Sequence, residues 1–277
     1  MPEVNTNKAA EKKKNSFDKT VKRHKRINKK AKAVAIVAAI IICAVGIYLC
    51  FDKLFFVKSI AVESGDKSDA EKLYTQEQLF EGLGIEKGMG LYEFDADDAE
   101  KNAKYSLPYF KEIKISRKWP STVVAKVIPE TPSFYCLISD NMYIVSDELK
   151  VLECTTDARK IEVNSLIYLK VGGIHNCIEG EKLGVEEDTE QIIDTLVQEL
   201  SKQGILERIT SIDVTDKFDI EMMYDTTYLV KLDDAKNLDS KIHFLTRIVE
   251  ERKDASGGGT IDLSNVSKKE AKFDKFS

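Results

Sequence analysis

The 277-residue chain is poor in the residue types that build disulfide frameworks and metal sites. It has five cysteines, three histidines and one tryptophan. Beyond residue 51, Cys136, Cys154 and Cys177 form no short paired spacing, so at most one bridge is expected among them. His175 stands near Cys177, but the local sequence supplies no further zinc ligands. We therefore expect no metal site and no cofactor.

Motifs of catalytic sites are also missing. The glycines from Gly82 to Gly90 lack the G-x-G-x-x-G spacing of a phosphate loop, and they follow an expected helix instead of preceding one. The acidic run from Glu93 to Glu100 lacks the central glycine of a calcium loop. No G-x-S-x-G nucleophile elbow occurs, and a single tryptophan argues against a sugar-binding cleft. The sequence predicts that the protein is not an enzyme and has no small-molecule substrate.

A long apolar run stands near the start of the chain. Every residue from Ala33 to Phe51 is uncharged, and a helix of this length reaches roughly 28 Å, close to the ~30 Å hydrocarbon core of a bilayer. A removed signal or a lipidated cysteine would need small residues where Ile47 to Cys50 has bulky ones. A buried core helix would usually be shorter and polar on one side. The run predicts a retained transmembrane helix over residues 33–51.

The charge distribution predicts the orientation of this helix. Residues 1–32 contain twelve Lys and Arg against three acids, a net charge of +9, whereas the whole chain carries −5. By the positive-inside rule, residues 1–32 form a basic cytoplasmic tail and the bulk of the chain is extracytoplasmic. The tail has one aromatic, Phe17, and no base-reading motif, so it indicates contact with anionic lipid and not with nucleic acid.

Residues 53–129 have the pattern of a two-layer module. Residues 57–62 are rich in β-branched side chains and predict a strand. Two helices are expected next, one capped by Thr75 and one by Asp95. Alternating apolar residues on both sides of Trp119 predict a β-hairpin. The order is β-α-α-β-β, which is typical of a small sheet with helices on one face.

Pro129 and Pro132 separate this module from a second, β-rich domain over residues 133–263. Strands are expected at residues 134–138, 142–145, 150–153, 167–171, 209–214, 219–223, 227–232 and 260–263. Amphipathic helices are expected at residues 189–203, capped by Asp188, and at residues 239–252. Residues 264–277 form a polar C-terminal tail. The predicted fold class is therefore α+β.

The last expected strand, Thr260 to Leu263, follows the flexible link Ser256 to Gly259. A strand in this position can leave a sheet edge whose free backbone groups pair with a strand of a partner. Internal closure of the sheet explains the pattern equally well. The residues by themselves predict an anchored binding module and name no partner.

Four short motifs stand in a characteristic order: FVKSIAV at residues 56–62, YFKEIKISRKWPST at residues 109–122, RITSI at residues 208–212 and TIDL at residues 260–263. With the tail, the apolar run and the β-α-α-β-β module, they resemble the FtsQ/DivIB family of bacterial cell division proteins. Two positions depart from the family pattern. Pro129-Glu130-Thr131-Pro132 stands where the family usually has Glu-Arg-x-Pro, and Leu149 stands where it often has glycine.

The resemblance implies a POTRA-like module, a location at the division septum in the bacterial cell membrane, and a non-enzymatic scaffold role in the divisome. The implied partners are the extracytoplasmic regions of the FtsL and FtsB/DivIC type division proteins, and the implied role is to help control septal peptidoglycan synthesis. In this family the partner docks largely against the last strands of the second domain. By position, the implied partner-binding residues are Tyr228, Val230, Leu232, Thr260, Ile261, Asp262, Leu263, Ser264, Lys272 and Phe273.

An alternative function also fits a POTRA-like module. Such modules act as chaperone or transport elements for exported polypeptides, usually in repeated copies or before a barrel. The sequence shows no internal repeat, which favours the divisome reading.

Overall fold

The computed structural model describes residues 31–48, 55–65, 69–252, 257–265 and 272–275. The predicted basic tail therefore lies almost entirely outside the described residues. A helix spans Ala31–Tyr48 and is long and apolar enough to cross a membrane. Its described side chains are all exposed, as expected of a helix whose surroundings are lipid instead of protein. The last residues of the predicted span, 49–51, lie outside the described part of the chain.

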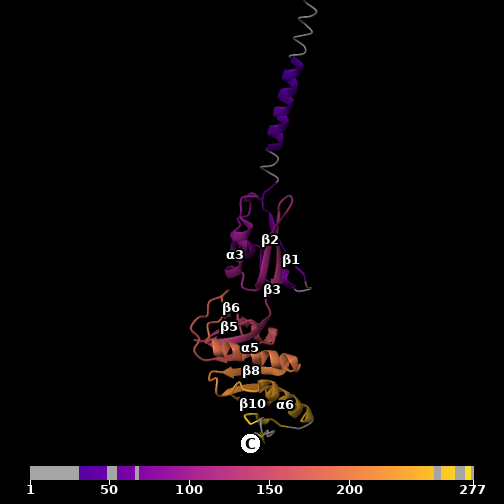
Figure 1. The fold of residues 1–277 in the computed structure, drawn as a ribbon. Coiled ribbons are helices and arrows are strands. Elements are labelled where there is room, and N and C mark those ends of the chain that lie inside the picture. The colour runs from indigo at the N-terminus through magenta and orange to yellow at the C-terminus, as the bar shows by residue number, and fades with distance from the viewer. Residues whose placement is uncertain (1–30, 49–54, 66–68, 253–256, 266–271, 276–277) are drawn as a thin grey trace, which may run out of the picture. The chain divides into compact units, whose positions relative to one another are not determined.

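Both sheets of the structure belong to one compact unit, and the N-terminal helix belongs to another. The smaller sheet has three strands, β1 (Ser59–Ser64), β2 (Phe110–Lys118) and β3 (Thr122–Pro129), in the order β1-β3-β2. β1 and β3 are parallel, and β2 and β3 form the predicted antiparallel hairpin. A short 3-10 helix, η1 (Asp69–Lys72), and two α-helices, α2 (Gln76–Leu83) and α3 (Ala96–Ser106), complete the module (Figure 1). The β-α-α-β-β prediction is confirmed.

Local signals explain why these helices begin where they do. Thr75 Oγ accepts a hydrogen bond from the Gln78 amide, and Gln78 Oε1 accepts one from the Thr75 amide, which completes the predicted capping box. Asp95 caps α3 by accepting from the amides of Asp97 and Asp98. Gly84 ends α2 at φ 66°, a left-handed conformation that costs glycine little.

The larger sheet contains nine strands. Their bounds are β4 (Pro132–Ile138), β5 (Asn141–Ser146), β6 (Val151–Thr155), β7 (Ile167–Val171), β8 (Ile209–Val214), β9 (Ile220–Tyr224), β10 (Tyr228–Asp233), β11 (Gly259–Asp262) and β12 (Lys272–Lys275). Their spatial order is β12-β11-β10-β9-β8-β7-β4-β5-β6. Within the described residues, the two edge strands of this sheet are therefore β6 and β12.

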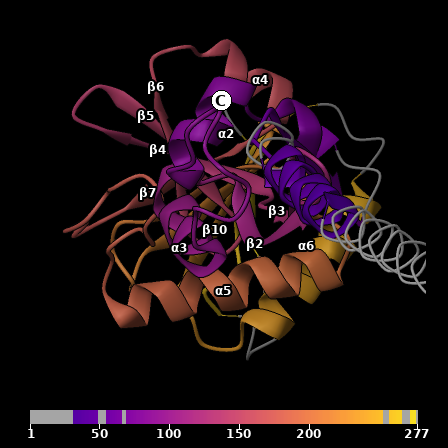
Figure 2. The same cartoon turned by 90° about the horizontal axis from the view of Figure 1, so that it is seen from above.

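Two long helices, α5 (Glu187–Lys202) and α6 (Leu238–Glu251), cover one face of the larger sheet (Figures 1 and 2). Their apolar stripes contribute Leu196, Leu200, Ile242 and Leu245 to the core, all of them fully buried. α5 begins earlier than predicted: Glu186 occupies the N-cap position and Asp188 lies in the first turn, so the assignment of Asp188 as the cap is wrong. An acidic side chain is favourable at either place because both lie near the positive end of the helix dipole.

The opposite face of the larger sheet is only partly covered. The short helix α4 (Arg159–Asn164), which was not predicted, contributes Ile161 to a small cluster around Ile144, Leu152 and Leu166. Helix α4 has no side-chain cap and no buried residue, which explains the lack of a sequence signal. A second 3-10 helix, η2 (Leu206–Arg208), leads into β8.

Candidate partner-binding edge

The predicted partner-binding residues lie on β10, β11 and β12, except for Leu263 and Ser264, which directly follow β11. β11 pairs with β10 in parallel and with β12 in antiparallel orientation. The strand expected to end the sheet, Thr260 to Leu263, is therefore an inner strand. In the sheet formed by the described residues, β12 is one of the two edge strands, although the sequence predicted a polar tail over these residues. Its sequence, KFDK, offered one apolar residue and no β-branched one.

Half of the predicted binding side chains face the core. Five of them, namely Tyr228, Val230, Leu232, Ile261 and Leu263, are between 0% and 7% exposed. These residues hold α6 and the sheet together, and β10 and β11 are inner strands whose backbone is already paired on both sides. Thr260, Asp262, Ser264 and Phe273 are half-buried, and Lys272 is exposed. The side chains that a partner could contact are therefore those on the sheet face that points away from the core, together with those of β12.

One aromatic side chain attaches β12 to the sheet. The Phe273 ring packs edge-on against the Tyr228 ring with centroids 6.2 Å apart. The Arg252 guanidinium carbon lies 3.4 Å from the Phe273 ring centroid, in cation–π contact. Neither contact was predicted, because each joins residues far apart in the sequence.

A glycine permits β12 to approach β11. A Cβ placed on Gly259 would lie 2.4 Å from the carbonyl oxygen of Asp274 and 2.7 Å from the Phe273 ring. Any other residue at position 259 would push β12 away. The sequence predicts a flexible link at this glycine, but in the structure close packing of the backbone requires it.

The face of the sheet opposite α5 and α6 carries a row of charges. Strand register places one charged residue from each of six neighbouring strands side by side: Lys170, Asp213, Glu221, Lys231, Asp262 and Lys272. We call this row the charge ladder. Opposite charges meet at Lys170 and Asp213, whose Nζ and Oδ2 atoms are 2.9 Å apart, and Lys231 pairs with Glu221. The ladder ends at β12, the free edge.

Hydrogen bonds set the ionisation of the ladder. The Ser264 hydroxyl and amide donate to Asp262 Oδ1 and lower the pKa of this carboxyl. The hydrogen bond to Glu221 raises the pKa of Lys231. Burial acts to raise the pKa of Asp213, but hydrogen bonds from Lys170 and Thr215 outweigh it and lower the value. Asp213, Lys231 and Asp262 therefore keep their charges at neutral pH.

The site has the composition of a binding surface. Among the described residues, no group of three or more His, Cys, Asp or Glu is placed to hold a metal ion. At this edge the main chain of β12 can form hydrogen bonds with another strand. The charged side chains beside it can favour one partner sequence over another.

One apolar N-terminal helix, a β-α-α-β-β module and a larger sheet with an open edge strand together define a class of anchored α+β binding proteins. The sequence profile of the POTRA domain, FtsQ-type, matches residues 69–128. The chain is also similar to the cell division protein FtsQ of Corynebacterium glutamicum, with 24% identity over 174 residues, covering 60% of this chain and 75% of that protein. Both matches are to FtsQ-type proteins and support the resemblance of this chain to the FtsQ/DivIB family of cell division proteins.

Proposed function

We propose that the protein is a non-enzymatic divisome scaffold that binds the extracytoplasmic regions of FtsL and FtsB/DivIC type proteins and helps to control septal peptidoglycan synthesis. The FtsQ-type POTRA domain and the similarity to an FtsQ support the division assignment. We further propose that residues 1–32 lie in the cytoplasm, that residues 53–129 and 133–263 form separate domains outside it, and that the protein concentrates at the septum. The charge of the tail supports this topology.

The observation that carries the proposal is the free edge of β12. An edge strand presents unpaired backbone donors and acceptors, so an extended partner segment can continue the sheet. Lys272 at this edge and Asp262 beside it would then select the charge pattern of the partner strand.

A pair of phenylalanine substitutions tests this edge. Phe273→Ala removes the side chain that attaches β12 to Tyr228 and Arg252. Phe218→Ala is the matched control, because Phe218 is 67% exposed and lies outside the edge strands. Each variant is made in the full-length chain with a fluorescent protein fused to Met1, and replaces the wild type in dividing cells.

We expect bands at mid-cell for the wild type and for Phe218→Ala. Phe273→Ala should lose at least tenfold in co-purification of the FtsB/DivIC type partner. An even membrane halo for the wild type would contradict the division role. Equal co-purification by both variants would contradict the β12 edge while leaving that role intact.

A further inference from the structure

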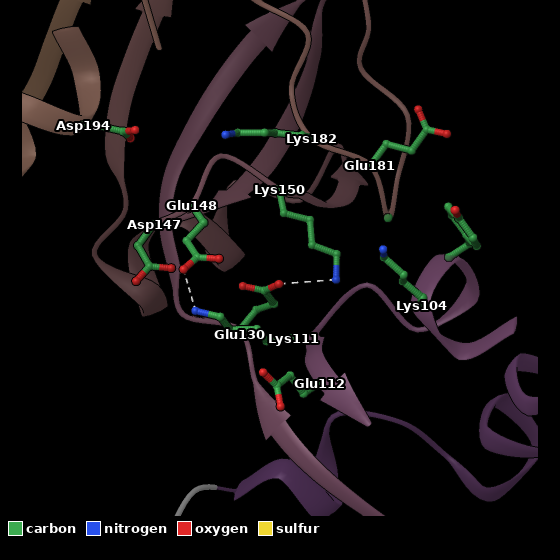
Figure 3. Close-up of a pocket in the computed structure, with 12 residues that line it drawn as sticks. Lys104, Lys111, Glu112, Glu130, Asp147, Glu148, Lys150, Glu181, Lys182 and Asp194 are labelled. Carbon is green, nitrogen blue, oxygen red and sulfur yellow. Dashed lines mark hydrogen bonds and ion pairs between the residues drawn. The ribbon is translucent and has the colours of Figure 1, made fainter. Parts of the chain in front are cut away.

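A second candidate binding site lies where the two sheets meet. A cavity of about 960 Å³ is lined by the end of α3, the start of β2, the residue after β3, the turn between β5 and β6, the loop after β7, and α5 (Figure 3). The loop approaches α3 closely at Gly180, where a Cβ would lie 2.5 Å from the carbonyl oxygen of Tyr105. The cavity is separate from the β12 edge, at the other end of the strand order.

Glu130 is the unusual residue of this cavity. Its side chain is only 3% exposed, and Oε1 lies 3.3 Å from Lys150 Nζ, which also donates to the Phe110 carbonyl oxygen at 3.0 Å. Glu130 Oε2 is buried and receives no hydrogen bond from the described residues. Figure 3 shows this second oxygen on the side of the carboxylate away from Lys150. A buried carboxylate oxygen that accepts no hydrogen bond is unfavourable, so a ligand that donates a hydrogen bond to this oxygen would be stabilised there.

The other charges of the cavity leave it short of cations. Lys111 pairs with Glu148 at 2.6 Å, and Lys182 pairs with Glu190 on α5. Four acids of the lining make no ion pair with the described residues: Glu112, Asp147, Glu181, which accepts a hydrogen bond from Asn176, and Asp194. Lys104 is the single lining lysine without an ion pair within the described part of the chain. Once these ion pairs are formed, the unpaired acids of the lining outnumber its unpaired lysines. The cavity therefore carries a net negative charge and has too few hydrogen-bond donors for its carboxylate oxygens.

We propose that this cavity binds a basic side chain, arginine or lysine, from an extended segment of a partner protein, with the cationic group donating to Glu130 Oε2. A guanidinium or ammonium group supplies the missing donor and the missing positive charge together. Lys150 keeps the carboxylate in place, so the acceptor is pre-organised. The volume exceeds that of one side chain and leaves space for the flanking backbone of the segment. The lining acids add attraction at the rim.

The probe for this site is the peptide acetyl-Ser-Gly-Arg-Gly-Ser-amide, and its matched control replaces arginine with citrulline, which has the same shape without the charge. Binding to the full-length chain is measured by saturation-transfer NMR. The chain is held in phosphatidylcholine nanodiscs, whose zwitterionic surface attracts neither peptide. We expect the arginine peptide to bind at least tenfold more tightly than the citrulline peptide.

Substitutions assign the binding to Glu130. Glu130→Gln keeps the size of the side chain and removes the charge, so the tenfold preference for arginine should be lost. Glu207→Gln makes the same change on an exposed residue outside the cavity and should keep the preference. A wild type that binds both peptides equally, or a Glu130→Gln variant that keeps the preference, overturns the proposal.

A second variant covers the case in which Glu130→Gln does not fold. Glu112→Gln with Asp194→Asn neutralises two exposed acids of the rim and leaves the buried pair untouched. We expect the preference for arginine to fall at least threefold. An unchanged preference in this double variant also overturns the proposal, because attraction at the rim is part of it.

Discussion

At the scale of single residues, Lys241 shows how this fold uses a buried charge. The side chain lies on α6, and the residue is 3% exposed. Its ammonium group donates to the carbonyl oxygens of Leu232 and Asp234 at 2.6 and 2.8 Å, and to Asp234 Oδ1 at 3.2 Å. Lys241 therefore ties α6 to the end of β10. Lys236 contacts the same carboxylate from the surface, at 2.6 Å.

Replacing each of the two lysines compares the stability that a buried ammonium group contributes with the stability that an exposed one contributes. Lys241→Met should lower the free energy of unfolding by about 2 to 4 kcal/mol, because two buried carbonyl oxygens lose their donor. Lys236→Met should lower the free energy of unfolding by less than about 1 kcal/mol, since the Lys236 side chain is 82% exposed and its ion pair with Asp234 is screened by solvent. Thermal unfolding of the full-length chain in detergent measures both. Similar losses in the two variants would show that Lys241 acts only as a surface charge.

Asp234 predicts a pH dependence. The hydrogen bond from the Lys236 side chain, assisted by the Lys236 amide and by Lys241, lowers the pKa of Asp234 from 3.8 to about 2. Because the folded protein holds this carboxyl ionised at lower pH than the unfolded chain does, its stabilising effect is complete above about pH 4 and is lost as the pH falls towards 2.

The measurement compares the wild type with Asp234→Asn. Their difference in unfolding midpoint should be largest near neutral pH and should shrink at about pH 3. Asp219→Asn, which removes a surface carboxylate with no ion pair among the described residues, is the control. A difference that stays constant with pH would assign the effect of Asp234 to shape and not to charge.

Gly259 predicts a local defect at the edge. Gly259→Ala should loosen β12 and cost about 1 to 3 kcal/mol, because the new methyl group overlaps the Asp274 carbonyl and the Phe273 ring. Gly65→Ala is the control, since a Cβ there meets nothing within 4 Å. Hydrogen exchange followed by mass spectrometry should show faster exchange over residues 272–275 in Gly259→Ala alone. Unchanged exchange would mean that β12 does not need this close approach.

At the scale of elements, the parts with local signals were predictable. Caps at Thr75 and Asp95 and the apolar stripes of α5 and α6 placed the helices α2, α3, α5 and α6 to within a few residues, whereas α4 was missed. The hairpin β2–β3 followed from alternation. β12 could not be predicted, because a polar four-residue strand is held by Phe273 contacts with residues distant in sequence. For the same reason, the sequence did not distinguish the core side chains of the candidate site from its accessible ones.

Leu149 illustrates a related point at a turn. Leu149 stands where the FtsQ/DivIB family often has glycine, and its backbone adopts φ 61°. Its side chain is fully buried. The turn between β5 and β6 has a left-handed backbone at this residue, and burial of the leucine offsets the conformational cost.

The charge ladder makes a prediction for the sheet. Lys170→Asp places like charges opposite each other at Asp213 and should destabilise the protein by about 0.5 kcal/mol, with a smaller loss at high salt. The double variant Lys170→Asp/Asp213→Lys should recover this loss, because the new lysine lies between two acids, one of them Glu221. Denaturant titrations at low and high salt check both variants. If the double variant is no more stable than Lys170→Asp, the charges of the ladder do not contribute to the stability of the sheet.

At the scale of the whole molecule, the proposed topology places the two sheets on the opposite side of the membrane from residues 1–32. Three thiols of the sheet unit differ in reactivity. Burial raises the pKa of Cys136 to about 12 and that of Cys177 to about 11, which keeps both as unreactive thiols. Cys154 is exposed.

A membrane-impermeant maleimide should therefore label Cys154 in intact reduced spheroplasts, and Cys154→Ser should lose the label. An Asn5→Cys variant in the Cys154→Ser background should be labelled only after permeabilisation. Labelling of residue 5 in intact spheroplasts would reverse the proposed orientation.

The strand order has a mechanical consequence. The edge strand β6 and the edge strand β12, which we propose as the partner-binding edge, are the two ends of one hydrogen-bonded sheet. A pull between the anchor and a partner bound at β12 would act across the strands, along their hydrogen bonds. Such a load opens a sheet one strand at a time, beginning with the four-residue strand that Phe273 holds. β12 would then act as the breaking point of the assembly, yielding under tension before the core beneath α5 and α6 is disturbed.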